Sequence, residues 1–318
     1  MKLSMILCTR NRADQLAGCL AKMAEVEPAR RDVEFVIVNN ASTDHTAEVI
    51  ETFAASAPFV VRPVLAERPG LARARNAGLA ASTGELLFFT DDDCYLEPGF
   101  FTRLERAVAD SGADYGGGQV LLYSPEDDER IANLRVGELE FIPAHTPVVH
   151  AGVIQGASMF FHRRVFDAAG PFDPELGAGT PFSCEDIEMV ARASRHGFIG
   201  ARVPGFTVYH HHTRLRGSPE AEKTMLEYDR GRGAYYATLL AAGVPEAWPE
   251  WWNESFTYGS GDDRAKLERL QRELQGAADY LAFRLAQPGL PPAPMKRLSI
   301  KDDAAALMKR IRRRVTAV

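Results

Sequence analysis

Three adjacent carboxylates, those of Asp91, Asp92 and Asp93, directly follow the apolar run ELLFFT at residues 85–90. Such a run is typical of a buried strand, and three acids at its end repel one another unless a cation or hydrogen-bond donors neutralise them. Mg²⁺ and Mn²⁺ prefer oxygen ligands, often one or two carboxylates together with the phosphates of a substrate. The cluster therefore favours a site for a metal and a diphosphate. The alternatives are an exposed acidic turn and an N-cap for a helix that starts near Pro98.

Two arginines precede this cluster in the segment PGLARARNAGLAASTGELLFFTDDD, residues 69–93. A helix from about Leu71 to Ala81 would carry Arg73 and Arg75 just upstream of the aspartates. One or both guanidinium groups could then reach a phosphate or a base. The alternative is that both arginines lie on a solvated helix face.

An acidic pair, Glu185 and Asp186, starts the helix-like segment SCEDIEMVARASRH at residues 183–196. One stripe of this helix is apolar or small and consists of Ile187, Val190, Ala191 and Ser194, which leaves the acidic pair at an exposed N-terminal turn. A carboxylate held ionised by a helix N-terminus beside a cleft is a ready general base. Ser183 and Asp186 also fit a capping box, which needs no catalysis.

Three histidines, His210, His211 and His212, follow the strand-like segment FTVY. Strand alternation sends His210 and His212 to one face and His211 to the other. A lone histidine is more often structural, but close to the aspartates one of these rings is a candidate metal ligand or phosphate donor.

The elements that position these groups alternate between strand and helix along the first hundred residues. Strand-like segments at 2–8, 33–38, 59–65 and 85–90 are separated by helix-like segments that start at about Asp14, Ser42 and Leu71. This rhythm predicts a mostly parallel sheet covered by helices, in which ligands bind at the carboxyl ends of the strands. The segments that follow three of the strands are CTRNR, NNASTD and TDDDC.

Beyond the first hundred residues the pattern changes. We expect an acidic helix near 126–140, a strand at 156–161, and two long amphipathic helices at 219–242 and 262–286 that flank an aromatic loop. Trp248, Trp251 and Trp252 in that loop favour packing between the two helices, with an acceptor-binding wall as the alternative. A linker at 287–294 and a short basic helix at 301–315 follow.

Composition and charge narrow the class of protein. The 318 residues are 46% hydrophobic with a net charge of −6, which is typical of a globular chain and argues against a general nucleic-acid binder. Four cysteines without CxxC spacing are expected to be small core residues. The segment MKLSMILCTRNR has too short an apolar core for a signal peptide, and no apolar run reaches about 18 residues. A cytoplasmic location, with or without a peripheral contact at the inner face of the membrane, is expected.

The basic end of the chain has two interpretations. From Lys296 onward, eight Lys and Arg stand against two Asp. The residues Arg310, Arg312, Arg313 and Arg314 could contact anionic lipid, which would suit a lipid-linked acceptor. Equal weight goes to an ordinary solvated helix or to a contact in a homo-oligomer.

Taken in order, these segments resemble the family-2 glycosyltransferases of the GT-A type, which are inverting enzymes that use nucleotide sugars. The matching segments span roughly residues 1 to 213 and are MILCTRNR (5–12), VIVNNASTDHT (36–46), GLARARNAGLAASTGELLFFTDDD (70–93), GASMFFHRRVFDAAGPFDPEL (156–176), CEDIEMVAR (184–192) and VYHHHT (208–213). The resemblance implies an α/β fold with a GT-A-type, Rossmann-like, mostly parallel sheet flanked by helices, and a C-terminal helical extension. Residues 1–217 would form the transferase domain, with 1–115 as the nucleotide-sugar-binding half and 116–217 as the acceptor half. Residues 218–318 would form the extension.

The resemblance also implies roles for single residues. Those that would bind the nucleotide sugar are Thr9, Arg10, Asn11, Asn40, Asp44, Arg75, Asp91 and Asp92. Asp93, the last acid of the family's DxD-type motif, and His210 would hold Mn²⁺ or Mg²⁺. Asp186 would be the catalytic base, and Glu185 and Gly179 would lie on the acceptor side.

The implied reaction moves a sugar from a nucleoside-diphosphate sugar to a hydroxyl of a glycan, a lipid-linked or a small-molecule acceptor. Asp186 would take the proton of that hydroxyl, the metal would neutralise the departing nucleoside diphosphate, and a single displacement would invert the anomeric carbon. One position departs from the family pattern: members that recognise uracil often have an acidic residue where Asn39 and Asn40 stand here. An amide offers donors as well as an acceptor, so the base of the donor stays open.

Three other classes of function compete with this interpretation. A sugar-phosphate nucleotidyltransferase shares a similar sheet and similar metal needs, but would favour a Gly-rich phosphate loop after the first strand, and CTRNRADQL has no glycine. A dinucleotide oxidoreductase would need GxGxxG after a strand. A catalytically inactive sugar-nucleotide-binding protein is the non-enzymatic alternative, against which the presence of both Asp93 and Asp186 weighs.

Overall fold

One sheet forms the centre of the molecule. The computed structural model describes residues 2–27, 30, 32–132, 137–257 and 261–287. The strands in this part of the chain are β1 (Leu3–Thr9), β2 (Val33–Asn40), β3 (Val60–Ala66), β4 (Leu86–Asp91), β5 (Cys94–Leu96), β6 (Tyr115–Leu122), β7 (Glu140–Ile142), β8 (Met159–His162) and β9 (Gly200–His210). Their order is β3-β2-β1-β4-β8-β6-β9-β5, and β7 pairs with β9.

The helices of the described residues are α1 (Ala13–Val26), α2 (Thr46–Ser56), α3 (Leu71–Ala81), α4 (Phe100–Ser111), α5 (Arg163–Ala169), α6 (Glu185–Arg195), α7 (Pro219–Ala241), α8 (Ala247–Trp252) and α9 (Asp263–Ala286). A short 3₁₀ turn, η1 (Gly156–Ser158), and a π-helical turn, η2 (Asn253–Thr257), complete them. The α/β fold with a sheet flanked by helices is confirmed. The parallel order predicted from the sequence holds for β3, β2, β1 and β4, whereas β8 runs antiparallel to β4 and makes the sheet mixed.

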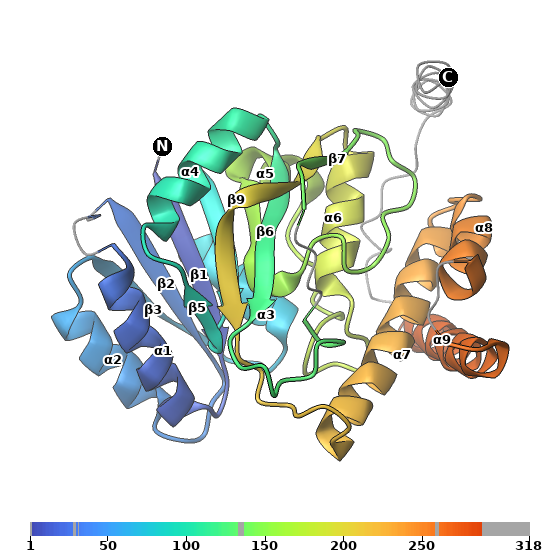
Figure 1. Ribbon diagram of the computed structural model, residues 1–318, viewed down its shortest axis with the longest axis horizontal. Coiled ribbons are helices and arrows are strands. Elements are labelled where there is room, and N and C mark those ends of the chain that lie inside the picture. The colour runs from blue at the N-terminus through green and yellow to red at the C-terminus, as the bar shows by residue number, and fades with distance from the viewer. Residues whose placement is uncertain (1, 28–29, 31, 133–136, 258–260, 288–318) are drawn as a thin grey trace.

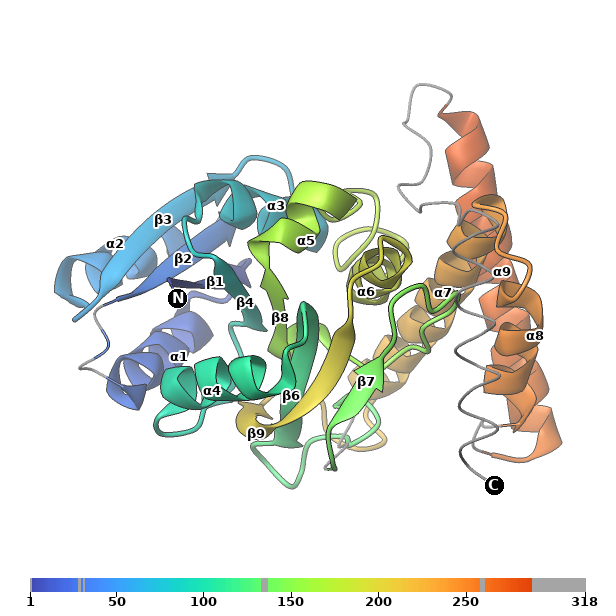
Figure 2. The same ribbon diagram turned by 90° about the horizontal axis from the view of Figure 1, so that it is seen from above.

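Strand alternation sorts the apolar side chains into two cores, one on each face of the sheet. Leu3, Met5 and Leu7 of β1 share one core with residues of α1, α2 and α4, whereas Ile6 and Cys8 share the other with residues of α3, α5 and α6. The two views show these helices on opposite sides of the sheet (Figures 1 and 2). All four cysteines are free and buried, so their interpretation as core residues is confirmed.

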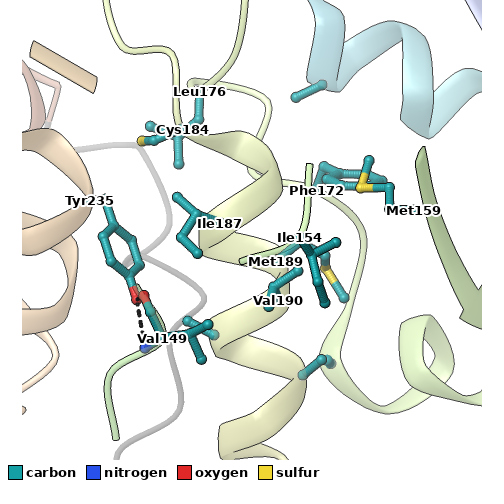
Figure 3. Packing of buried hydrophobic residues seen from close by; sticks show 14 of the residues in the cluster. Val149, Ile154, Met159, Phe172, Leu176, Cys184, Ile187, Met189, Val190 and Tyr235 are labelled. Atoms are coloured by element: carbon teal, nitrogen blue, oxygen red, sulfur yellow. Dashed lines mark hydrogen bonds between the residues drawn. The ribbon is translucent and has the colours of Figure 1, made fainter. Parts of the chain in front are cut away.

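The helices α7, α8 and α9 lie beside α6, at the end of the sheet away from α2 (Figures 1 and 2). Tyr235 of α7 packs against the α6 side of the core, near Ile187, and its hydroxyl donates to the backbone oxygen of Val149 at 2.8 Å (Figure 3). The helices α7 and α9 approach closely because both have glycine at the contact. A Cβ at Gly233 would lie 1.8 Å from the backbone oxygen of Glu273, and one at Gly276 would lie 2.3 Å from that of Arg230.

The tryptophans after α7 divide between core and surface. Trp251 is buried, stacks on Tyr236 of α7 with ring centroids 5.0 Å apart, and donates from Nε1 to Glu273 Oε2 of α9 at 2.6 Å. It packs between the two helices, as the packing interpretation expects. Trp248 and Trp252 are 55% and 52% exposed, so that interpretation is wrong for them.

The predicted acidic helix near 126–140 is wrong over the described residues. Asp127 forms an isolated β-bridge with Leu215, and Asp128, which is fully buried, accepts hydrogen bonds from the backbone and side chain of Arg130 at 3.0 Å. These acids take part in backbone pairing and in a hydrogen-bonded turn, and they do not lie on a solvent-facing helix. Residues Glu140–Ile142 form β7 and pair with β9. Apart from Gln287, the linker at 287–294 and the basic helix at 301–315 lie outside the described residues. None of the helices described is both long and apolar enough to cross a membrane.

Candidate active site

The carboxyl ends of β1, β2 and β4 bring three of the predicted segments together. Thr9 at the end of β1 pairs in register with Asn39 of β2, and Cys8 pairs with Asp91 of β4. Thr9 Oγ1 also donates a hydrogen bond to Asp92 Oδ2 at 2.6 Å. The parallel register therefore places CTRNR, NNASTD and TDDDC at one edge of the sheet, as expected from the strand order.

Two acids of the aspartate cluster are buried, Asp91 is partly exposed, and all three have cationic partners. Asp92 and Asp93 are each only 3% exposed. Arg12 bridges both, with Nη1 2.9 Å from Asp92 Oδ1 and Nη2 3.0 Å from Asp93 Oδ2. His210 Nε2 lies 3.2 Å from the other oxygen of Asp93. The exposed-turn alternative is therefore wrong, and so is the N-cap, because Gly99 caps α4 without a side-chain hydrogen bond.

Burial and these partners shift the pKa values of Asp92 and Asp93 in opposite directions. Burial raises the pKa of Asp92 to about 7, although the charge of Arg12 opposes the shift. Burial also acts to raise the pKa of Asp93, but the hydrogen bond and charge of His210, with Arg12, outweigh it and hold that pKa well below its usual range. Burial disfavours the charged form of His210, yet Asp93 outweighs this and raises the histidine pKa. Asp93 is thus the acid that stays ionised for a cation.

A set of possible metal ligands surrounds Asp93. Among the described residues, one ligand atom each of Asp91, Asp93, Cys94 and His210 lie within 4.8 Å of one another. The antiparallel pairing of β5 with β9, which sets His210 opposite Cys94, brings them there. Burial raises the pKa of the Cys94 thiol well above its usual value, so its thiolate is disfavoured. The carboxylates and the imidazole fit Mn²⁺ or Mg²⁺, and Nδ1 of His210 is buried without a hydrogen-bond partner.

Arg75 connects the aspartates to the start of α6. It is 2% exposed, so the solvated-face alternative is wrong for it. Nη1 donates to Glu185 Oε1 at 2.6 Å, and Nη2 lies 3.5 Å from Asp91 Oδ1 and 3.3 Å from the backbone oxygen of Gly156. Burial raises the pKa of Glu185 to about 7 against the opposing charge of Arg75. Arg73 instead pairs with Glu175 at 2.7 Å near the surface.

Glu185 and Asp186 differ in environment although they are neighbours. The prediction that both lie at an exposed turn is wrong for Glu185, which is buried against Arg75. Asp186 is half-buried, and its Oδ2 and Oδ1 accept from the backbone nitrogens of Gly156 at 3.0 Å and Ile187 at 2.7 Å. The capping box does not form, because Cys184 is the N-cap and makes no side-chain cap hydrogen bond.

In the segment NNASTD at the end of β2, asparagine side chains accept hydrogen bonds from nearby backbone nitrogens. Asn39 Oδ1 accepts from the backbone nitrogen of Ser42 at 2.9 Å, and Asn40 Oδ1 accepts from that of Gly70 at 3.1 Å. The amide oxygens therefore already bond to the backbone. Asn11 Oδ1 likewise accepts from the backbone nitrogen of Thr43 at 2.7 Å. The amide oxygens of Asn39 and Asn40 each keep a second lone pair, and their NH₂ groups are further donors that a ligand could meet.

Three predicted site residues lie apart from the aspartates. Arg10 is exposed, and the Asp44 carboxylate accepts from the backbone nitrogens of Ala13 and Thr46 at 3.2 and 3.1 Å, where it ties together the starts of α1 and α2. Gly179 has φ 87° and lies in a loop that packs on the start of α3, since Leu71 N donates to Ala178 O at 2.9 Å. No hydrogen bond or ion pair among the described residues joins Arg10, Asp44 or Gly179 to the aspartates.

Arg12 is a candidate site residue that the sequence analysis missed. It stands in the strand-end segment CTRNR, and that position was the one available signal. It also borders a cavity of about 490 Å³, whose other lining residues are Gln15, His212, Thr213, Arg214, Leu215, Ser218 and Glu220. His211 and His212 are held by the buried acidic turn, through Asp127 Oδ2 at 2.9 Å and Asp128 O at 3.1 Å.

Known proteins share this sequence pattern and this fold. The sequence family described as glycosyl transferase family 2 matches residues 4–170. Glycosyltransferase AglE of Haloferax volcanii is 25% identical over 195 residues, which are 61% of this chain and 62% of AglE, so the chain covers under two thirds of that relative. Among solved structures, mannosyltransferase PcManGT from Pyrobaculum calidifontis, in complex with GDP-Man and Mn²⁺, superimposes with a TM-score of 0.60 at 19% identity and covers 98% of this chain and 79% of its own. GalNAc-T7 with UDP, GalNAc and Mn²⁺ gives a TM-score of 0.55 at 18% identity, over 92% of this chain and 58% of its own. At such identities the structures establish a common fold. Because the family match covers more than half of this chain, the chain belongs to glycosyltransferase family 2.

Proposed function

We propose that this protein is a metal-dependent, inverting glycosyltransferase that moves a sugar from a nucleoside-diphosphate sugar to an acceptor hydroxyl. The observation that carries the proposal is the arrangement around Arg75, which contacts Asp91 of the aspartate cluster on one side and Glu185, next to Asp186, on the other. One buried arginine thus contacts both the candidate donor site and the neighbour of the candidate base. PcManGT and GalNAc-T7, whose solved structures hold Mn²⁺, support a divalent cation here.

Asp93 and His210 would hold Mn²⁺ or Mg²⁺, which when bound supplies positive charge to stabilise the departing nucleoside diphosphate. Thr9 and Arg12 orient Asp92. With Asp91 held by Arg75, the cluster presents carboxylates toward the ribose and diphosphate of the donor.

Asp186 is the proposed general base. The backbone donors of Gly156 and Ile187 fix its two oxygens, and each carboxylate oxygen keeps a further lone pair that can accept a proton. The acceptor hydroxyl would give its proton to Asp186 as its oxygen attacks the anomeric carbon. The bond from that carbon to the diphosphate breaks in the same displacement, and the diphosphate leaves with the electron pair, so the configuration inverts.

The donor base is proposed to differ from uracil. Uracil presents an N–H that needs an acceptor. The amide oxygens of Asn39 and Asn40 each use one of two lone pairs on a backbone hydrogen bond, and a neutral amide is a weaker acceptor than the carboxylate that uracil-binding members often have here. A thermal-shift panel of UDP, GDP, dTDP and CMP sugars with Mn²⁺ tests this, because a ligand that binds only the folded state raises the melting temperature. A shift with the UDP sugars alone would contradict the inference. The acceptor, and any membrane or oligomer contact through residues 301–315, stay predictions.

The base assignment is tested with Asp186→Asn. We expect nucleoside-diphosphate binding, measured by calorimetry, to persist, and transfer, measured by product formation, to fall about 10²–10⁴-fold because the general base is lost. Asp167→Asn, an exposed acid of α5, is the matched control and should leave transfer unchanged. Undiminished transfer by Asp186→Asn would remove Asp186 from this role. Donor binding by the wild type without turnover on any acceptor would favour the inactive binding protein.

A further inference from the structure

Arg12 occupies carboxylate oxygens that a divalent cation would need. It contacts one oxygen each of Asp92 and Asp93 at 2.9 and 3.0 Å, and its Nε donates to Gln15 Oε1 at 2.9 Å, which fixes the guanidinium in place. His210 Nε2 lies 3.2 Å from the second oxygen of Asp93. Both oxygens of Asp93 therefore have a nitrogen partner within ion-pair distance.

A divalent cation and this contact compete for the same oxygens. Mn²⁺ and Mg²⁺ coordinate a carboxylate oxygen directly, and Mg²⁺ does so at about 2.0–2.1 Å. A cation on Asp93 Oδ2 would then lie next to the guanidinium that now sits 3.0 Å from that oxygen. Two positive groups that close repel each other strongly where water is scarce, and Asp93 is only 3% exposed. Arg12 must move before Oδ2 can take a metal.

The structure offers Arg12 a place to move to. Its side chain is 33% exposed and borders the cavity of about 490 Å³. Arg214 and Ser218, the N-cap of α7, line the same cavity, which also contains one exposed carboxylate, Glu220. A diphosphate beside this cavity could accept the guanidinium in a bidentate contact.

We propose that Arg12 is a built-in counter-cation that keeps divalent metal off Asp93 Oδ2 until a nucleoside diphosphate draws the arginine away. This inference rests on the proposed metal-dependent function. It makes the binding of metal and of diphosphate cooperative through one side chain, and by linkage each ligand must tighten the other by the same factor.

The test measures Mn²⁺ binding to the full chain by electron paramagnetic resonance, first without nucleotide and then with GDP or UDP, with protein-free Mn²⁺–nucleotide samples subtracted. We expect Arg12→Gln to bind Mn²⁺ alone about 10- to 100-fold more tightly than the wild type, within the usual range of coupling. The same variant should lose most of the gain in Mn²⁺ affinity that the diphosphate gives the wild type. Arg12→Lys keeps the charge but cannot bridge two carboxylates in a planar fork. Its Mn²⁺ affinity should therefore lie between those of the wild type and Arg12→Gln.

A control separates this effect from overall charge. Arg106 is 83% exposed and pairs with Asp110 on α4, so Arg106→Gln removes the same charge and should leave Mn²⁺ affinity unchanged. Unchanged or weaker Mn²⁺ affinity in both folded Arg12 variants, with Mn²⁺ still bound, would overturn this inference and leave the proposed function intact. Absence of Mn²⁺ binding in every protein, with and without diphosphate, would overturn the metal site and this inference together.

Discussion

Replacing Arg75 by methionine tests whether the buried ion pair with Glu185 holds the candidate site together. Arg75 is 2% exposed, and its Nη1 lies 2.6 Å from Glu185 Oε1, with Asp91 Oδ1 3.5 Å from Nη2. Methionine keeps most of the volume but removes the guanidinium that contacts both acids. Burial has already raised the pKa of Glu185 to about 7, against the pull of Arg75. The variant leaves this carboxylate buried and uncompensated.

The expected cost follows from the burial of both partners. Removing one member of a buried pair destabilises a protein by about 3–5 kcal/mol, whereas replacing both by apolar groups is often close to neutral. Arg75→Met should therefore lower the free energy of unfolding by about 3–5 kcal/mol. The double variant Arg75→Met/Glu185→Leu should recover about 2–3 kcal/mol of it as coupling. Arg73→Met is the matched control, since its pair with Glu175 is 28% and 19% exposed and is worth at most about 1 kcal/mol.

The pH dependence gives a second readout. The folded-state pKa of Glu185 lies above its usual value of 4.5, so the stability gained from its neutral form is complete below 4.5 and is lost as pH rises through about 7. Without Arg75 the charged form is disfavoured further, so the deficit of Arg75→Met should be small at pH 5 and large at pH 8. Urea unfolding at both pH values measures it. A deficit below about 1 kcal/mol at pH 8, or one that is equal at both pH values, would refute the reasoning.

Two further predictions concern the folded state away from the aspartates. Burial acts to raise the pKa of Glu34, but hydrogen bonds from Ser4, Arg62 and Thr83 outweigh it and lower that pKa from 4.5 to about 2. This shift contributes about 3 kcal/mol to the free energy of unfolding, which is present above pH 4.5 and is lost as pH falls toward 2. Glu34→Gln should therefore unfold more easily at pH 7, and its free energy of unfolding should fall less steeply between pH 4.5 and pH 2, which is the acid limb of the curve. An acid limb as steep as that of the wild type in urea titrations would contradict this. Gly233→Ala would place a Cβ 1.8 Å from the backbone oxygen of Glu273, so we expect a loss of about 1–3 kcal/mol and a lower melting temperature by calorimetry. Gly18→Ala, which has nothing within 4 Å, should instead stabilise α1, and equal melting temperatures for the two variants would rule out the close contact as the cause.

Local patterns in the sequence were enough to predict most elements. The helix over 71–81 is found as α3 (Leu71–Ala81), and the long helices at 219–242 and 262–286 are found within a residue as α7 and α9. Apolar periodicity over ten or more residues identifies a helix without knowledge of its partners. The placement of CTRNR, NNASTD and TDDDC at one sheet edge also followed from the sequence, because parallel strands end together.

Local patterns failed where a polar residue owes its position to a distant partner. The acids at 126–140 suggested a helix, but Asp127 bridges to Leu215, and Asp128 bonds into a buried turn. Glu185 belongs by spacing to an exposed helix start, yet it pairs with Arg75, which is 110 residues away in the sequence. Arg12 had no local signal beyond its place after β1, and it lies on Asp93, 81 residues further along the chain.

The sequence by itself therefore determined most of the elements, the edge of the sheet where the candidate site lies, and the acids and histidine that gather there. Only the tertiary structure decided which cation neutralises which acid, that Arg75 and Glu185 are buried together, and that Arg12 lies across Asp92 and Asp93. The reason is physical. Helices and strands depend mainly on side chains a few residues apart, whereas burial and ion pairing depend on groups that meet only when the sheet, α3 and α6 pack.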